Sequence, residues 1–240
     1  MNGLISNIRY SGRMLIMFYA LFSVGSLSMI AAMICAGRFY KVSVLKCVIS
    51  ALLLTVIGLA GANLMNFIET GFESTSGKSF FGALFLVPAL MPLAAKMLKI
   101  KTSEMLDMCS PCGCVIVTIL KINCYISGCC FGRIIYRDSE ICIRFPSQIV
   151  ESVTALILMF VLFIMMKKGK YRDVLYPWYM ILYGIIRFFL NLLRETKPLF
   201  WILPGGNFWS LIAIATGLIW LYLVGKKRKN GLKKTDSATK

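Results

Sequence analysis

The chain has 240 residues, of which 58% are hydrophobic and 15% are charged, and its mean hydropathy is +0.77. A soluble domain is nearer to about half apolar and about a quarter charged, so the composition excludes a soluble globular enzyme, a disordered tail and a collagen-like chain. The absence of histidine excludes a histidine base, metal ligand or pH switch. We therefore predict an all-α polytopic membrane protein.

Apolar runs long enough to cross a hydrocarbon core of about 30 Å recur along the chain. We expect seven spans, at residues 14–36, 42–68, 79–98, 103–126, 148–166, 174–193 and 206–224. The fourth is the least regular, because it carries Asp107, Lys121 and Asn123 and is expected to break near Pro111 and Gly113. No cleavable signal peptide is expected, since the first run lacks a convincing small-residue cleavage site.

The positive charges predict how these spans are oriented. The segment after residue 224 is strongly basic, with Lys226, Lys227, Arg228, Lys229, Lys233 and Lys234. The positive-inside rule places such a segment in the cytoplasm, and an odd number of spans then places the N-terminus outside. We expect residues 1–225 to form one transmembrane domain and residues 226–240 a basic cytoplasmic tail. Most of the net charge of +17 is then a topology signal with attraction to anionic lipid, and no nucleic-acid partner is expected.

One predicted outer loop departs from this charge rule. Residues 127–147 carry three arginines, Arg133, Arg137 and Arg144, against two acidic residues. Two interpretations remain open: a site for an anionic head group at the outer face, or a translocated loop that tolerates a few arginines.

Ionisable residues inside spans indicate function in a membrane chain, because each costs roughly 2.5–3.5 kcal/mol at the helix centre unless it is satisfied. Arg187, Asn191 and Arg194 have the spacing i, i+4, i+7 and are expected to share one helix face that points into the bundle. Gln148 and Glu151 are expected to share a face in a polar network. A purely structural pair of Arg187 with Glu151, holding two helices together, is the alternative.

The segment between the fourth and fifth spans adds a lysine and two glycines. Gly128 and Gly132 permit tight turns near a site. Lys121 can bind phosphate as a point charge, or act as a base if it is desolvated.

Six of the nine cysteines lie between residues 109 and 130. In or near a span, cysteine commonly packs as a small apolar residue, and packing is the simplest interpretation. The alternatives are a disulfide in the outer loop, for which Cys129, Cys130 and Cys142 are candidates, and a metal site or reactive thiol.

Five motifs occur in order along the chain. They are Ser-Phe-Phe-Gly-Ala, Lys-Ile-Asn-Cys-Tyr-Ile-Ser-Gly-Cys-Cys-Phe-Gly-Arg, Phe-Pro-Ser-Gln-Ile-Val-Glu, Tyr-Gly-Ile-Ile-Arg-Phe-Phe-Leu-Asn-Leu-Leu-Arg and Gly-Asn-Phe-Trp-Ser. From about Tyr19 to Leu223 the sequence resembles the prolipoprotein diacylglyceryl transferase family. The resemblance implies a bacterial inner-membrane enzyme that moves the diacylglyceryl group of phosphatidylglycerol to the lipobox cysteine of a lipoprotein precursor. It also implies release of glycerol phosphate and no metal or organic cofactor.

The resemblance assigns roles to individual residues. Arg187 matches the essential arginine of the family's Tyr-Gly-x-x-Arg-Phe motif, and Gln148 and Glu151 match its His-Pro-x-Gln-x-x-Glu motif. Lys121 stands where the family has the arginine that opens its Gly-Arg-x-Gly-Asn signature. The candidate catalytic residues are Arg187, Lys121, Glu151 and Tyr19. The candidate residues for the lipid head group are Arg133, Arg194, Gln148, Asn191, Gly128 and Gly132.

The sequence departs from the family at several polar positions. Phe81 and Phe145 stand where the family has histidines, one of which is proposed as the base. Asn191 and Cys129 each replace a glutamate, and Asn207 replaces a glutamine. Two alternatives therefore stay open: a paralogous transferase with another lipid or acceptor, and a non-catalytic phospholipid-binding membrane protein. A small transporter is disfavoured, because the halves of the chain show no repeat.

Overall fold

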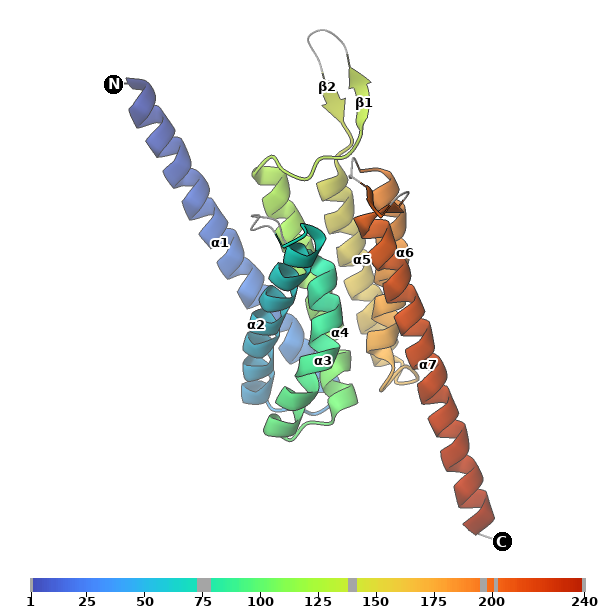
Figure 1. Ribbon diagram of the computed structural model, residues 1–240. Coiled ribbons are helices and arrows are strands. Elements are labelled where there is room, and N and C mark those ends of the chain that lie inside the picture. The colour runs from blue at the N-terminus through green and yellow to red at the C-terminus, as the bar shows by residue number, and fades with distance from the viewer. Residues whose placement is uncertain (1, 73–78, 138–141, 195–197, 201–202, 239–240) are drawn as a thin grey trace.

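The computed structural model describes the backbone of residues 2–72, 79–137, 142–194, 198–200 and 203–238. Side chains are described for residues 20–72, 79–136, 143–194 and 205–230. Within these ranges the chain forms an upright bundle of seven helices (Figure 1). In chain order they are α1 (Asn2–Phe39), α2 (Val44–Glu69), α3 (Phe80–Leu98), α4 (Thr102–Ile126), α5 (Ser147–Lys167), α6 (Leu175–Leu192) and α7 (Gly205–Ala238).

Six of these helices are long and apolar enough to cross a membrane, and α6 is the exception among the described elements. The helix α6 falls short because its 18 residues include Arg187, Asn191 and three tyrosines. It nevertheless packs along α7 for much of its length. The prediction of an all-α, multi-pass membrane protein is therefore confirmed.

The helix α4 lies at the centre of the bundle. It contacts α1, α3, α5 and α6 and is the most buried of the six candidate spans. The expected break near Pro111 and Gly113 is wrong, since α4 is one continuous helix. Proline is tolerated inside membrane helices when neighbouring groups satisfy the backbone. Gly113 instead makes room for a neighbour, because a Cβ there would stand 2.5 Å from the hydroxyl of Tyr179 on α6.

A buried carboxylate fixes the start of α6. Asp107 of α4 accepts hydrogen bonds from the backbone N–H groups of Asp173 at 2.7 Å and Leu175 at 2.9 Å, and from the hydroxyl of Tyr40 at 2.9 Å. The first N–H groups of a helix have no partner within it, and α6 has no side-chain cap of its own. Asp107 supplies that cap from another helix and thereby sets the position of α6 against α4.

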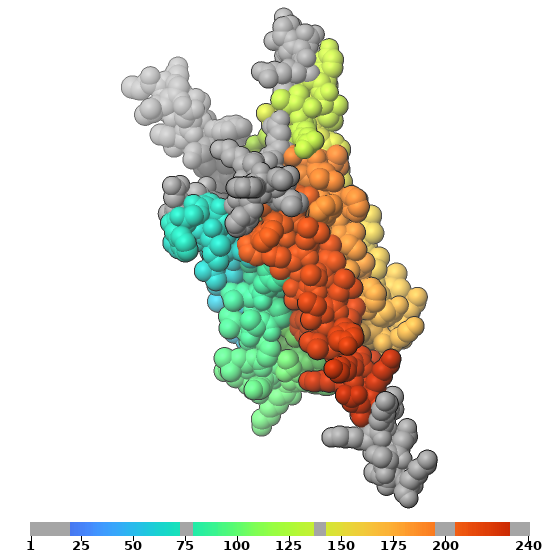
Figure 2. Space-filling view, turned by 45° about the vertical axis from the view of Figure 1, so that its right-hand side comes forward, coloured from blue at the N-terminus to red at the C-terminus, as the bar shows by residue number. Residues whose placement is uncertain are grey.

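Two small hairpins add strands that were not predicted. Strands β1 (Ile134–Arg137) and β2 (Cys142–Arg144) pair antiparallel, as do β3 (Pro198–Phe200) and β4 (Leu203–Pro204). The β1–β2 hairpin projects beyond the helices at one end of the bundle, as Figure 2 shows. The N-terminus points to that end and the C-terminus to the other (Figure 1). The helix α7 continues past residue 225, so no break in structure separates the expected tail from the bundle.

Candidate functional site

A single buried carboxylate draws three cations together near the hairpin end of the bundle. Glu151 of α5 has its Oε2 2.6 Å from Nζ of Lys121 on α4, and the same oxygen pairs with Nη1 of Arg187 on α6. Its Oε1 lies 3.2 Å from Nη1 of Arg194, just after α6. The cluster of Lys121, Glu151, Arg187 and Arg194, called the charged cluster below, thus joins three helices.

The charged cluster is largely shielded from solvent. The side chain of Glu151 is 3% exposed, those of Lys121 and Arg187 are 16% exposed, and that of Arg194 is 13% exposed. Three cations against one carboxylate leave positive charge in excess. Glu69 of α2 acts electrostatically on Arg187 but makes no ion pair with the cluster among the described residues. A buried site with excess positive charge suits an anionic ligand such as phosphate.

One polar atom of the charged cluster and one on Gln148, a turn before Glu151 on α5, lack a partner among the described residues. Oε1 of Gln148 and Nε of Arg194 are buried without a hydrogen-bond partner in the described part of the chain. Buried polar groups are nearly always hydrogen-bonded in native proteins. One donor and one acceptor are therefore left for a ligand or for water at this position.

The expected face of α6 is partly correct. Asn191 is buried and Arg187 enters the charged cluster, as predicted. The helix ends at Leu192, however, so Arg194 lies in the turn that follows and not on the helix face. The turn returns Arg194 to Glu151, because its backbone N–H bonds to the carbonyl of Asn191 at 3.2 Å.

Hydrogen bonds from the start of α5 fix the backbone of the segment after α4. The amide Nε2 of Gln148 donates to the carbonyl of Cys129 at 2.5 Å, and the hydroxyl of Ser147 donates to the carbonyl of Cys130 at 2.7 Å. Gly128 and Cys130 have positive φ angles of 65° and 61°, a region that glycine enters readily and cysteine rarely. Gln148 and Ser147 therefore fix the segment that follows α4.

Gly132 and Arg133 connect the same segment to the end of α6. The N–H of Gly132 donates to the carbonyl of Phe145, and that of Arg133 donates to the carbonyl of Leu193, each at 3.0 Å. A Cβ on Gly132 would lie 2.7 Å from the carbonyl oxygen of Phe145. The side chain of Arg133 is exposed, and its Nε reaches the carbonyl of Arg194 at 3.4 Å. Arg133 thus lies outside the charged cluster.

Three cysteines gather beside the cluster. The Sγ atoms of Cys124, Cys129 and Cys130 all lie within 4.8 Å of one another. A hydrogen bond with Cys124, together with the nearby Lys121 and Arg194, outweighs burial and lowers the pKa of the Cys130 thiol to about 5. No described cysteine forms the disulfide considered above, and the side chain of Cys142 lies outside the described residues.

The two phenylalanines for which the resemblance implies histidine in the family contact neighbouring residues in the structure. Phe81 is buried, with its ring centroid 5.9 Å from that of Tyr183, and the tilted ring of Phe80 lies 5.2 Å from the same tyrosine ring. Phe145 is half-buried beside Gly132. The phenylalanine side chains at 81 and 145 offer no base.

Other expected residues fall outside the cluster or the described side chains. Asn191 is buried against Gly206 of α7, with its Nδ2 lacking a partner among the described residues. Tyr19 belongs to α1, but its side chain lies outside the described residues. The sequence reasoning missed Glu69, which accepts a hydrogen bond from Ser79 at 2.9 Å and acts on Arg187. The one sequence signal for Glu69 was its position at the end of an apolar span.

Comparison with known proteins identifies the family. The sequence model of prolipoprotein diacylglyceryl transferases matches residues 8–223. The chain belongs to this family. The phosphatidylglycerol–prolipoprotein diacylglyceryl transferases of Ehrlichia ruminantium strains Welgevonden and Gardel are each 30% identical over 164 residues, covering 61% of this chain and 63% of the relative. The enzyme of that name from Chlorobaculum tepidum is 27% identical over 133 residues, covering 52% of this chain and 46% of the relative.

The matched part of the chain thus spans less than two thirds of the length of each of these curated relatives. Membership of the prolipoprotein diacylglyceryl transferase family agrees with the resemblance carried by the five motifs and with the apolar helices.

Proposed function

We propose that the chain transfers the diacylglyceryl group of phosphatidylglycerol to the lipobox cysteine of a lipoprotein precursor. The observation that carries this proposal is the charged cluster, which lies between α4, α5 and α6 of this chain. The relatives are named for phosphatidylglycerol and prolipoprotein, and the phosphate of the lipid is the anion that the excess positive charge suits.

Within this proposal the cations hold the lipid phosphate. Arg187 and Lys121 bind phosphate oxygens and stabilise the charge that develops on glycerol phosphate as it leaves. Arg194, through its unpaired Nε, and Gln148, through its unpaired Oε1, orient the head group. Glu151 keeps the three cations together in the absence of lipid. Arg133, Asn191, Gly128 and Gly132 shape the surrounding turn and helix ends.

The reaction forms a carbon–sulfur bond and breaks the bond between the glyceryl carbon and a phosphate oxygen. The thiol proton needs an acceptor, and the sequence has no histidine. Glu151 is a weak base while three cations surround it, and Lys121 is engaged by Glu151. The departing phosphate is itself an acceptor, because the second pKa of a phosphate monoester is roughly 6. Tyr19 remains a candidate base on the sequence evidence.

We further propose seven spans in the bacterial cytoplasmic membrane, with the N-terminus outside and the C-terminus in the cytoplasm. The opposite directions of the two termini support an odd number of crossings (Figure 1). The basic end of α7 supports a cytoplasmic C-terminus. The charged cluster then lies toward the outer leaflet, at the end of the bundle where the hairpin projects (Figure 1).

A non-catalytic lipid-binding role is the second candidate. The observation that favours it is the packing of Phe81 against Tyr183, which replaces a polar position by a closed apolar contact. Such a protein binds the lipid phosphate but does not transfer the diacylglyceryl group.

Turnover by the purified full chain separates the two candidates. The protein is incubated in phosphatidylglycerol-containing micelles with a synthetic lipobox peptide, and glycerol phosphate release and the mass gain of the peptide are followed. We expect turnover that falls by about 10²–10³ in Arg187→Ala, as for the loss of one charge-stabilising donor. Lys101→Ala, at the opposite end of the bundle, serves as the control. Turnover unchanged in Arg187→Ala contradicts the role given to the charged cluster. A folded wild type without turnover contradicts the transferase proposal and favours the lipid-binding candidate.

A further inference from the structure

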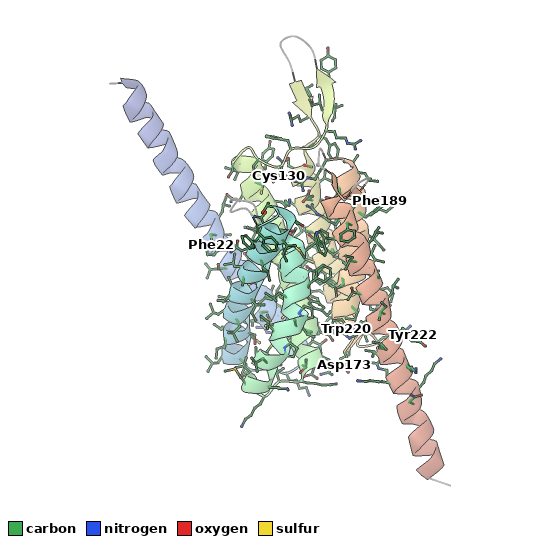
Figure 3. The ribbon with its side chains drawn as sticks, in the orientation of Figure 1. Phe22, Cys130, Asp173, Phe189, Trp220 and Tyr222 are labelled. Atoms are coloured by element: carbon green, nitrogen blue, oxygen red, sulfur yellow. The ribbon has the colours of Figure 1, made fainter. Side chains whose placement is uncertain are left out.

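The thiols of Cys124, Cys129 and Cys130 form a cluster that the proposed transfer reaction does not use. Cys124 is near the end of α4 and half-buried, whereas Cys129 and Cys130 are exposed in the turn that follows. Cys130 lies at the hairpin end of the bundle in Figure 3, opposite Asp173. The three Sγ atoms lie within 4.8 Å of one another, so they converge without any change of backbone.

We propose that Cys124, Cys129 and Cys130 bind one thiophilic metal cation of the Zn²⁺ type beside the charged cluster. Sulfur ligands around tetrahedral zinc, with Zn–S bonds of about 2.3 Å, stand roughly 3.8 Å apart. Small side-chain rotations bring sulfur atoms already within 4.8 Å to that spacing. Thiolate ligands select soft cations over Mg²⁺ or Ca²⁺.

The surroundings balance the charge of such a site. Three thiolates and a divalent cation carry one net negative charge. Lys121 acts electrostatically on all three thiols, and Arg194 acts on Cys130. These two cations therefore compensate the metal-bound thiolates, as counter-charges around a ligand set commonly do.

The backbone around the two exposed ligands is already fixed. Gln148 holds the carbonyl of Cys129 and Ser147 holds that of Cys130, so both hydrogen bonds come from the start of α5. Ordered supports of this kind orient metal ligands. The exposure of Cys129 and Cys130 provides the entry path that a metal requires. Three protein ligands leave the fourth position of a tetrahedral ion open.

Cadmium titration tests the site without reference to lipid transfer, so its outcome is independent of the proposed function. The full chain in detergent micelles is reduced, freed of reductant without air and titrated with Cd²⁺, while the ultraviolet thiolate-to-cadmium absorption band is recorded. We expect saturation at one Cd²⁺ per chain, displacement by Zn²⁺, and a loss of affinity of about tenfold or more in Cys129→Ser and Cys130→Ser. Cys35→Ser, which removes an exposed thiol on α1, leaves the titration unchanged.

Protection from alkylation gives a second readout that needs no variant. Wild-type protein is treated with a maleimide with and without Cd²⁺, and the labelled cysteines are mapped by mass spectrometry. Protection of Cys124, Cys129 and Cys130, with Cys35 labelled equally in both samples, supports the site. Absence of saturable uptake, equal uptake by a Cys129→Ser/Cys130→Ser double variant, or unprotected thiols overturns it. A disulfide within the trio that forms in air, with no Cd²⁺ uptake by the reduced protein, also overturns it.

Discussion

Glu151 is the residue on which the charged cluster depends. It is 3% exposed and is the only carboxylate among the described residues that pairs with Lys121, Arg187 and Arg194. Burying three like charges without it is costly, because removing one partner of a buried ion pair leaves uncompensated charge. The ion pairs of the cluster thus hold three helices together, as the purely structural interpretation of Arg187 and Glu151 expects. They also leave positive charge in excess.

Neutralising Glu151 is therefore expected to destabilise the free protein. Glu151→Gln should lower the free energy of unfolding by about 3–5 kcal/mol, measured by denaturant unfolding in detergent micelles. Combining it with Lys121→Met should recover part of the loss, since one of the repelling charges is then removed. Stability equal to wild type in Glu151→Gln would show that the ion pairs do not hold the helices.

The helix α6 shows how an element with a weak membrane signal is held in the bundle. Its Arg187 and Asn191 lower its apolar content, and its first turn depends on Asp107 from α4. This cap lies at the end of the bundle away from the charged cluster. Asp107 therefore positions α6 as a whole, and with it Arg187.

Removing the acceptor at Asp107 is expected to weaken the bundle. Asp107→Asn replaces one accepting oxygen by an N–H donor and leaves a buried backbone N–H without a partner, a loss of about 1–3 kcal/mol. Glu104→Gln is the matched control, because its pair with Arg172 at 2.9 Å is partly exposed and is worth about 0–1 kcal/mol. Thermal unfolding in micelles compares the two, and equal effects would contradict the capping role of Asp107.

The contact between α2 and α3 depends on two glycines. A Cβ on Gly61 would lie 2.5 Å from the carbonyl oxygen of Gly82, whereas a Cβ on Gly58 would meet only Ala83, at 3.8 Å. We expect Gly61→Ala to destabilise the protein because the two backbones must separate. Gly58→Ala should be neutral or stabilising by up to about 1 kcal/mol, through helix propensity. Unfolding midpoints of the two variants give the comparison, and the same sign for both would refute the close contact.

Local pattern predicted much of the fold, and long-range contacts account for what it missed. The apolar runs marked the positions of the helices, six of which are long and apolar enough to cross a membrane, because membrane spans depend on local composition. The continuity of α4 through Pro111 depends on its neighbours in the bundle. The β1–β2 hairpin depends on pairing between two short strands, and strands of four and three residues carry too little sequence pattern to be predicted. The face shared by Gln148 and Glu151 followed from helix geometry.

The site was foreseen only in part for the same reason. Arg187, Lys121 and Glu151 were named together as candidate catalytic residues, and their pairing was considered only for Arg187 with Glu151. The contact of Lys121 with Glu151 depends on how three helices pack. The sequence did not single out these three of the nine cysteines, because Cys124 lies near the end of α4 whereas Cys129 and Cys130 lie in the segment after it. Only the structure brings their sulfur atoms together.

At the scale of the whole molecule, the positive charges predict one orientation across the membrane. Green fluorescent protein fused after residue 240 should be fluorescent in bacterial cells, because it folds in the cytoplasm. Alkaline phosphatase fused after Tyr136, in β1 of the projecting hairpin, should be active, because it requires the periplasm. A green fluorescent protein fusion that does not fluoresce, together with an inactive phosphatase fusion, would contradict an outer position for the charged cluster.

Equilibrium binding of phosphatidylglycerol tests the central claim most directly. The purified chain in phosphatidylcholine micelles is titrated with phosphatidylglycerol and the bound lipid is counted by native mass spectrometry. We predict saturable binding that weakens by tenfold or more, about 1.4 kcal/mol or more, in both Arg187→Ala and Lys121→Met, with Lys101→Ala unchanged. Equal affinity of the wild type and the two cluster variants would show that the charged cluster does not hold the lipid phosphate.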